Sequence, residues 1–456
     1  MDLKTIIDQQ QRFFLEGRTR PLTFRKEQLQ LLKRALRDSE QRLMEAIEAD
    51  FGKSRYETYQ TELAMIYHEI NLVLRRLDRW ASKKRVSTNL ANFPGRSYLL
   101  PEPLGTVLII GAWNYPYQLT LVPLVSAMAA GNTAIVKPSE LPARTSRAMA
   151  EILNAIFPPE YVLVQEGGVP ETTELLQHRF DKIFFTGSTA VGRIVAQAAA
   201  KHLTPVTLEL GGKSPVFVLP DADLRRTAQR IVWGKFLNAG QTCIAPDYVL
   251  VDQAIEAALV QDLKEEIEAR FGRDGSSSEA YVRIIHQRHF ERLLSLIDPR
   301  KVVCGGTSDR ERLFLAPTLM KGVSFSDSVM TEEIFGPLLP VISYHGLDEA
   351  IASVKSRPKP LALYIFTRDG GAADRILSDL SFGGGSVNDT VTYISNSALP
   401  FGGVGESGMG KYHGEAGFRE FSHVKSILKR SLWFEPSLKY PPYTPFKMKL
   451  LRFLME

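Results

Sequence analysis

Gly105-Thr-Val-Leu-Ile-Ile-Gly-Ala-Trp-Asn-Tyr-Pro116 decides the fold class of this chain. It contains a short apolar run at 107–110, and a helical stretch at 119–130 follows it. The same alternation continues with further apolar runs and another helical stretch, at 133–136, 146–156, 161–164 and 182–186. Continuous apolar strands that alternate with helices are typical of a parallel sheet covered on both faces. The sequence therefore predicts an α/β fold.

The regions on either side extend this organisation. Residues 1–85 are charged and show apolar spacings of three and four, as amphipathic helices do. A second series of strands and helices is expected after residue 209, at 215–219, 224–237, 247–251, 255–271, 340–344 and 361–366, with a loop at 272–278. A chain of 456 residues is too long for one compact core, so we expect two or three domains.

Composition excludes several classes of protein. Apolar residues make up 44% and charged residues 23%, which is ordinary for a soluble globular protein. The net charge of +5 is thinly spread, with no basic stripe among aromatics, so nucleic acid is not an expected partner. The two cysteines form no disulfide framework and fit a reducing, cytoplasmic setting. No secretory signal, membrane span or metal-ligand spacing is recognisable, so we expect no metal.

Cys243 lies in the polar turn Asn238-Ala-Gly-Gln-Thr-Cys243-Ile. A cysteine in such a turn packs poorly in a core and is a candidate nucleophile. Upstream, Glu209 precedes a double glycine in Leu208-Glu-Leu-Gly-Gly-Lys-Ser-Pro215, where a carboxylate can serve as a base. Covalent catalysis needs a nucleophile and a base of this kind. The second cysteine, Cys304, is interpreted as a small apolar residue at the end of a strand.

Two glycine-rich segments compete as a phosphate site. Gly403-Val-Gly-Glu-Ser-Gly408 has the literal GxGxxG spacing, but no apolar strand precedes it, so we interpret it as a structural turn. The segment 182–193 has an apolar strand, a Gly/Ser turn and the start of a helix over 191–202, whose amides can face a phosphate. Its candidate contacts are Thr186, Gly187, Ser188 and Gly192. Such turns are also common without a ligand, which leaves a purely structural role open.

Three further segments carry polar groups near strand ends. Asn114 follows the run at 107–110 and is a candidate oxyanion donor, or else part of an Asn-x-Pro turn. Lys137 ends the run at 133–136 and is a candidate for ribose or phosphate contacts, or a solvated strand-end lysine. Glu333 and Phe335 are candidates for holding sugar hydroxyls and flanking a ring, or else mark the end of a helix.

Together these motifs resemble the aldehyde dehydrogenase family. Besides the glutamate and cysteine motifs, five further segments match motifs of the family and occur in the same order along the chain. They are Trp113-Asn-Tyr-Pro, Val136-Lys-Pro-Ser-Glu140, Phe185-Thr-Gly-Ser-Thr-Ala-Val-Gly192, Glu332-Glu-Ile-Phe-Gly-Pro337 and Leu399-Pro-Phe-Gly-Gly403. The resemblance covers nearly the whole chain and is greatest to the class 3 branch, which includes fatty-aldehyde dehydrogenases. The features of that branch are the short N-terminus, Cys243-Ile-Ala-Pro-Asp-Tyr248, Gly408-Met-Gly-Lys-Tyr-His-Gly414 and Tyr440-Pro-Pro-Tyr443.

The resemblance implies a Rossmann-like cofactor-binding domain, an α/β catalytic domain and a small oligomerisation arm. The cofactor-binding domain is expected at 1–80 and 100–209, and the catalytic domain at 210–415. The arm is expected at 81–99 and 416–445, followed by a tail at 446–456. A homodimer is implied. Membrane-bound members of the branch end in a hydrophobic anchor, and we expect no transmembrane anchor here.

The resemblance also implies site roles. Cys243 attacks the aldehyde, Asn114 and the Cys243 backbone N–H hold the oxyanion, and Glu209 activates the hydrolytic water. Cofactor contacts are expected from Trp113, Lys137, Glu140, Thr186, Gly187, Ser188, Gly192, Glu333 and Phe335, and a substrate funnel from Tyr115 and Phe401. NAD is the expected cofactor, because Glu140 accepts ribose hydroxyls and repels a 2′-phosphate; NADP is the alternative.

The implied reaction is the NAD(P)-dependent oxidation of a medium- or long-chain aliphatic, or aromatic, aldehyde to the acid. A second interpretation is a CoA-acylating dehydrogenase, in which a thiol takes the acyl group. Glu209 disfavours it, because thiolysis needs no base for water. A third is a non-catalytic structural protein on the same scaffold, which intact Cys243, Glu209 and Asn114 disfavour.

The tail is predicted to form a helix with Phe446, Leu450 and Phe453 on one face. Its eleven residues are too few for a bilayer, which needs about 20. We interpret it first as a helix docked on its own or a partner subunit. The alternative is a lid, or a weak membrane-surface contact, near the mouth of a funnel for long-chain aldehydes.

Overall fold

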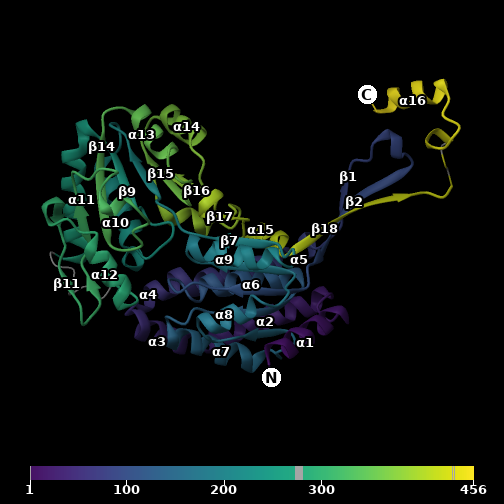
Figure 1. The fold of residues 1–456 in the computed structure, drawn as a ribbon, viewed down its shortest axis with the longest axis horizontal. Helices are drawn as coiled ribbons and strands as arrows, with labels where there is room; N and C mark the ends of the chain where they lie inside the picture. The colour runs from purple at the N-terminus through teal and green to yellow at the C-terminus, as the bar shows by residue number, and fades with distance from the viewer. Residues whose placement is uncertain (1, 273–280, 434, 436, 456) are drawn as a thin grey trace.

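The computed structural model describes residues 2–272, 281–433, 435 and 437–455 (Figure 1). The N-terminal region is helical, as its apolar spacing predicts. It contains α1 (Leu3–Leu15), α2 (Leu22–Asp38), α3 (Glu40–Phe51), α4 (Arg55–Thr58), a π-helix (Tyr59–Leu63) and α5 (Ala64–Trp80). These helices bury apolar side chains at helical spacing, such as Leu29, Leu32 and Leu36 in α2.

A six-stranded sheet follows, in the order β17-β7-β6-β3-β4-β5. Its strands are β3 (Thr106–Ile110), β4 (Thr133–Lys137), β5 (Val162–Val164), β6 (Lys182–Thr186), β7 (Val206–Glu209) and β17 (Gly408–Met409). All pairings are parallel except that of β17 with β7. The predicted α/β fold is therefore confirmed, and β17 adds an antiparallel edge from late in the chain.

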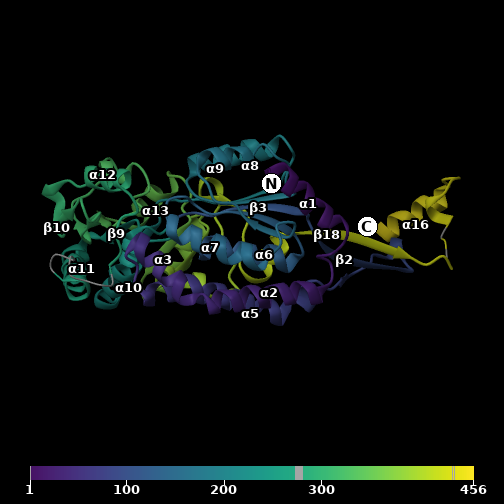
Figure 2. The same cartoon turned by 90° about the horizontal axis from the view of Figure 1, so that it is seen from below.

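Helices cover both faces of this sheet. Val107 and Ile109 of β3 pack with α6 (Gln118–Ala130) and α7 (Ala143–Ile156) in one apolar cluster. The alternate residues Leu108 and Ile110 pack with α1 and with α9 (Thr189–Ala200) in a second cluster. Figure 2 shows α9 and α8 (Val169–Leu175) on one side of β3, with α6 and α7 on the other and α2 and α5 outside them. Successive side chains of a strand point to opposite faces of the sheet, and both faces are covered by helices. Each strand is therefore a continuous apolar run in the sequence.

A second sheet has the order β10-β13-β14-β9-β8-β15-β16, parallel except for β10. Its strands are β8 (Pro215–Val218), β9 (Tyr248–Asp252), β10 (Val302–Cys304), β13 (Thr318–Met320), β14 (Leu338–Tyr344), β15 (Ala362–Phe366) and β16 (Gly384–Val387). The accompanying helices are α10 (Leu224–Phe236), α11 (Glu256–Phe271), α12 (Gln287–Ser295), α13 (Leu347–Lys355) and α14 (Gly370–Asp379), and β11 (Ser308–Asp309) pairs with β12 (Phe314–Leu315). The expected strands and helices are present, and Cys304 ends β10 as predicted. Beyond Gly272, the loop expected at 272–278 lies outside the described residues.

An antiparallel arm of β1 (Lys84–Val86), β2 (Gly95–Pro103) and β18 (Ser422–Arg430) extends away from both sheets (Figure 1). The helix α15 (Gly414–Glu420) leads into β18, and α16 (Pro445–Met455) lies at the far end of the arm beside the 3-10 turn Leu90–Asn92. The tail is thus helical, as predicted. The domain limits given above remain a prediction. Among the described residues, no helix has both the length and the hydropathy of a membrane span.

Candidate active site

Several of the predicted site residues lie at one edge of the first sheet. Because β3, β4, β6 and β7 are parallel, their carboxyl ends meet there, with Ile110 paired to Lys137 and Thr186 paired to Glu209. Asn114 follows β3 by a short loop. Ligands of parallel α/β sheets bind at this edge. The strand pattern predicted this edge for Asn114, Lys137 and the turn after 182–186, whereas Glu209 was predicted from its motif.

Asn114 joins this edge to the turn that carries Cys243. Its side chain is buried, and Nδ2 donates to the carbonyl of Gln241 over 3.1 Å. Its own carbonyl accepts from Nδ2 of Asn238 over 2.9 Å. The loop after β3 is therefore bonded in two directions to the segment 238–243.

The turn 238–240 has an unusual left-handed backbone. Asn238 and Ala239 have φ of 54° and 52°, and Gly240 has φ of 72°. A Cβ on Gly240 would lie 2.3 Å from the carbonyl oxygen of Gly336, so only glycine fits. The Gln241 side chain fixes the turn by donating to the Asn238 carbonyl over 3.1 Å. Left-handed non-glycine residues cost of order 1–3 kcal/mol each and are concentrated at functional sites.

Cys243 is partly buried beside two carboxylates. Burial raises the pKa of its thiol, and the charges of Glu333 and Glu209 raise it further. The neighbouring Thr242 hydroxyl lies 2.7 Å from the hydroxyl of Tyr115, which holds the residue before the cysteine. A thiolate nucleophile at this position needs positive charge or hydrogen-bond donors brought close to it.

Glu209, the last residue of β7, is the least satisfied carboxylate of the site. It is 3% exposed, and neither carboxylate oxygen accepts a hydrogen bond from the described residues. Burial raises its pKa well above the usual range, and the charge of Glu420 adds to this. Buried polar atoms without partners are rare, and a perturbed carboxyl of this kind is a candidate acid–base group.

The candidate phosphate turn links β6 to α9. The N–H of Gly187 donates to the Glu209 carbonyl over 3.0 Å, while the Ser188 hydroxyl caps α9 by accepting from the N–H of Val191. The predicted extra hydroxyl is therefore engaged by its own helix. A Cβ on Gly192 would lie 2.6 Å from the Leu210 side chain, so glycine permits the close packing of helix and strand. The buried Thr186 hydroxyl has no partner in the described structure.

Lys137 is not a solvated strand-end lysine, so that alternative is wrong. Its side chain is 2% exposed, and Nζ donates to the Pro138 carbonyl over 2.7 Å. Burial lowers its pKa. Glu140 lies 3.6 Å from Nζ and is 47% exposed. With Ser139 and Arg147, Glu140 lines a cavity of about 160 Å³ at the start of α7.

Glu333 and Phe335 lie in an irregular segment after the 3-10 helix Ser328–Met330. The Glu333 carboxylate packs against Gly211, where a Cβ would lie 1.9 Å from Oε2. Burial raises the Glu333 pKa to about 8. The Phe335 ring lies edge-on to Trp113, with centroids 5.3 Å apart. The motifs at 113 and 333–335, far apart in sequence, are therefore in contact.

The two predicted funnel residues, Tyr115 and Phe401, are both buried. Phe401 stacks on His413 with centroids 5.6 Å apart, and on Tyr393 at 6.4 Å. Their role towards substrate remains a prediction. The glycine-rich segment 403–408 forms a turn, as predicted, with φ of 67° at Gly405 and β17 after it.

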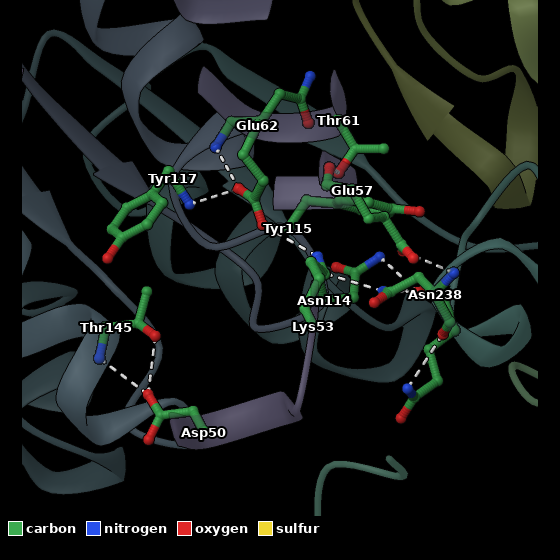
Figure 3. Close-up of polar contacts among 12 residues, drawn as sticks. Asp50, Lys53, Glu57, Thr61, Glu62, Asn114, Tyr115, Tyr117, Thr145 and Asn238 are labelled. Carbon is green, nitrogen blue, oxygen red and sulfur yellow. Dashed lines mark hydrogen bonds and ion pairs between the residues drawn. The ribbon is translucent and has the colours of Figure 1, made fainter. Parts of the chain in front are cut away.

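Sequence reasoning missed several residues of the site. His289 and Tyr393 carried no recognisable motif. A buried charged cluster behind Asn114 carried none either (Figure 3). The imidazole of His289 contacts Trp113, and its Nε2 lies 2.7 Å from the Phe335 carbonyl. Burial lowers the His289 pKa to about 4, so the ring is neutral and donates to that carbonyl. Among the described residues, no cluster of acidic, histidine or cysteine side chains is suited to a metal ion.

The arrangement fits a dinucleotide. The helix α9 begins at the candidate phosphate turn after β6, and the buried Thr186 hydroxyl, which has no partner among the described residues, lies at that turn. The cavity beside Glu140 follows β4, and β3 lies between β4 and β6. The groups at this edge are suited to phosphate and ribose hydroxyls, because helix amides bind anions and carboxylates bind hydroxyls. Cys243 and Glu209, the candidate nucleophile and base, interact electrostatically with each other.

Comparison with known proteins agrees with this chemistry. Residues 1–427 match the model of the aldehyde dehydrogenase family. The chain is 47% identical over 444 residues to mouse (Mus musculus) aldehyde dehydrogenase family 3 member A2, covering 97% of this chain and 92% of that protein. It is 46% identical over 453 residues to mouse dimeric NADP-preferring aldehyde dehydrogenase, and the match covers 98% of this chain and 99% of that protein. A solved structure described as the substrate-bound state of Staphylococcus aureus AldH superposes with a TM-score of 0.98 at 43% identity, covering 100% of both chains. The chain belongs to the aldehyde dehydrogenase family, and it is an NAD(P)-dependent enzyme that oxidises aldehydes to carboxylic acids.

Proposed function

We propose that Cys243, Asn114 and Glu209 carry the reaction, with Cys243 as nucleophile. The observation that supports this most is a partly buried thiol that interacts electrostatically with a buried carboxylate, for which the described residues offer no hydrogen-bond partner. The Cys243 thiolate forms a bond to the aldehyde carbon, and the carbonyl oxygen becomes an oxyanion. The Asn114 amide and the Cys243 backbone N–H donate to that oxyanion. An oxyanion donor of this kind contributes about 3–4 kcal/mol in the transition state.

When bound, oxidised NAD(P) would accept the hydride that the former aldehyde carbon loses. An acyl thioester on Cys243 remains. Glu209 then takes a proton from water, the water oxygen attacks the thioester carbon, and the acid and the thiol are released. The ionised form of Glu209 is the active base, so its raised pKa makes it a stronger base for this step.

We propose that cofactor binding uses the residues at the carboxyl edge of the first sheet. Lys137 and Glu333 hold the ribose hydroxyls, and the Gly187–Gly192 turn holds the pyrophosphate. Trp113 and Phe335 contact each other and flank the nicotinamide side. Glu140 is half-exposed beside the cavity at α7, where its charge favours NAD over NADP.

The substrate, assembly and compartment are proposed more broadly. We infer medium- or long-chain aliphatic, or aromatic, aldehydes as substrates, a homodimer as the working form and the cytoplasm as its location. The name of one relative includes "dimeric", and that supports the homodimer. The apolar side chains exposed on α16, such as Phe446 and Phe453, support a partner subunit or a weak membrane-surface contact there.

One assay tests the hydrolytic mechanism against the CoA-acylating alternative. Purified enzyme with hexanal and NAD should form NADH and hexanoic acid in equal amounts, and added coenzyme A should not change the product. The same assay with hexadecanal and benzaldehyde ranks the substrate classes by kcat/KM. Formation of hexanoyl-CoA in place of the acid would overturn the role of Glu209 as base for water.

A further inference from the structure

A cluster of buried charges lies directly behind Asn114 (Figure 3). Its members are Lys53 in the connection between α3 and α4, Glu57 in α4 and Glu62 in the π-helix. Their exposed fractions are 0%, 7% and 0%. Burying charged groups costs free energy even when they are paired, and well-packed apolar residues are often as stable or more so. None of the three is needed for the bond changes described above, so another role must explain their burial.

Lys53 and Glu62 hold the loop between β3 and α6. Lys53 Nζ lies 3.2 Å from Glu62 Oε1 and donates to the Asn114 carbonyl over 3.4 Å. Glu62 Oε2 accepts from the backbone N–H groups of Tyr117 and Gln118, each over 2.9 Å. The ion pair therefore contacts the loop at Asn114 and again at the start of α6.

Glu57 holds the other side of the site. Its Oε1 accepts from the backbone N–H of Asn238 over 2.9 Å, where the left-handed turn before Cys243 begins. Asn238 in turn donates from Nδ2 to the Asn114 carbonyl over 2.9 Å. The cluster therefore reaches Asn114 by two routes, directly from Lys53 and through Glu57 and Asn238.

The π-helix (Tyr59–Leu63) gives this region its geometry. Its i→i+5 hydrogen bonding replaces α-helical geometry between α4, which contains Glu57, and α5, and Glu62 lies within it. The Thr61 hydroxyl donates to the Glu57 carbonyl over 2.7 Å within the same segment. Single π-turns are rare and are frequently found at functional sites.

We propose that Lys53, Glu57 and Glu62 are positioning residues for the catalytic reaction. They fix the Asn114 carbonyl and the turn 238–243 relative to each other, so that the Asn114 amide and the Cys243 N–H point at one oxyanion. This inference rests on the proposed role of Asn114 as an oxyanion donor. Displacements of about 1 Å at such a donor are costly, which explains why buried charges are retained here.

A double-mutant cycle tests this proposal. Glu57→Ala should lower kcat/KM for hexanal at least tenfold, with KM for NAD within twofold of wild type. Glu57→Gln keeps an acceptor oxygen for Asn238 and should recover activity to within threefold of wild type. In an Asn114→Ala enzyme, Glu57→Ala should cost less than a further twofold, because the donor that it positions is already absent.

Two further variants keep the test decisive if Glu57→Ala folds poorly. Asn238→Gly retains the left-handed backbone and the backbone N–H that donates to Glu57, but it removes the Nδ2 hydrogen bond to the Asn114 carbonyl. The fall in kcat/KM that this variant causes should also disappear in the Asn114→Ala enzyme. Glu69→Ala is the matched control, because Glu69 is another buried carboxylate that accepts from a loop N–H, that of Gly414, over 2.9 Å. In the double variant, the fold-change in kcat/KM caused by Glu69→Ala should multiply with the fold-change caused by Asn114→Ala.

The outcomes separate the two proposals. If Asn114→Ala lowers kcat/KM but the Glu57→Ala and Asn238→Gly effects multiply with it, as for Glu69→Ala, the positioning role is overturned and the oxyanion role stands. If Asn114→Ala leaves kcat/KM unchanged, both are overturned. The positioning role is supported if Glu57→Ala and Asn238→Gly no longer lower kcat/KM in the Asn114→Ala enzyme and if Glu57→Gln recovers activity.

Discussion

The Asn114 amide donates to the Gln241 carbonyl over 3.1 Å, two residues before Cys243. This bond joins the loop after β3, in the first sheet, to the turn that precedes β9, in the second sheet. Together with the bond from Asn238 Nδ2 to the Asn114 carbonyl, it links the candidate oxyanion donor and the candidate nucleophile across the two sheets. A change in either loop should alter the chemical step more than the binding of cofactor.

Replacement of the nucleophile should separate these two functions. Cys243→Ala is expected to abolish NADH formation, because no thiolate remains to form the covalent bond. Cofactor affinity should stay within about threefold of wild type, because the proposed contacts lie mainly on β4, β6 and α9. Quenching of tryptophan fluorescence by NADH measures the affinity. Substantial NADH formation by the purified variant would show that Cys243 is not the nucleophile.

Replacement of the base should trap the acyl enzyme. Glu209→Gln leaves thiolate attack and hydride departure in place but removes the group that accepts a proton from water. We expect a burst of NADH equal to the enzyme concentration, followed by turnover slowed at least a hundredfold. Intact-mass spectrometry after addition of hexanal and NAD should show a hexanoyl adduct. A deacylation rate equal to that of wild type would assign the base elsewhere.

Cofactor preference should depend on Glu140. This carboxylate is 47% exposed and lies 3.6 Å from Lys137 Nζ, beside the cavity at α7. Repulsion of a 2′-phosphate at such a solvated site is of order 1 kcal/mol, or about fivefold. Glu140→Gln should therefore lower the KM ratio of NADP to NAD by about that factor. Glu166→Gln, on the same cavity, is the control for a general loss of negative charge. An unchanged ratio would remove Glu140 from the adenosine site.

Features of the site that local sequence patterns produce could be predicted, and features that tertiary packing produces could not. Lys137 ends an apolar strand and Asn114 follows one, and the rule for parallel sheets assigns such positions to the ligand edge. Glu209 ends β7, which the apolar pattern did not predict, and it was found from its motif beside the double glycine. Lys53, Glu57 and Glu62 instead lie in a charged, helical region, where charged residues usually face water. Their burial comes from tertiary packing of the π-helix against the loop at 114–118, which no local pattern reports.

Stability should depend on pH through Glu69. Burial raises its pKa to about 7, whereas 4.5 is its ordinary value and applies in the unfolded chain. Between these values the folded state binds more protons, so the free energy of unfolding falls as pH rises from about 4.5 to 7. Glu69→Gln removes this titration. Relative to wild type, it should gain up to about 3 kcal/mol between pH 4 and pH 8.

Urea denaturation of both proteins across this pH range measures the difference between their unfolding free energies. Glu415→Gln, on the exposed side of α15, is a suitable control because its carboxylate is 41% exposed. Parallel curves for wild type and Glu69→Gln would mean that Glu69 titrates near its ordinary pKa in the folded protein.

The tail should act between subunits. Figure 1 shows α16 at the outer end of the arm, on the side away from α10 and β9, which flank Cys243 in sequence. This position disfavours a lid over the site of the same chain. Phe446 and Phe453 are 74% and 80% exposed, and this apolar face favours docking on a second copy.

Deletion of 444–456 should lower Tm and shift the mass of the protein at low concentration from that of a dimer towards that of the monomer. It should change kcat/KM for hexanal and hexadecanal by the same factor. Phe453→Ser should reproduce the effect and Lys449→Ser should not, because Lys449 lies off the apolar face. A selective rise in KM for hexadecanal would instead support a lid over the partner's site.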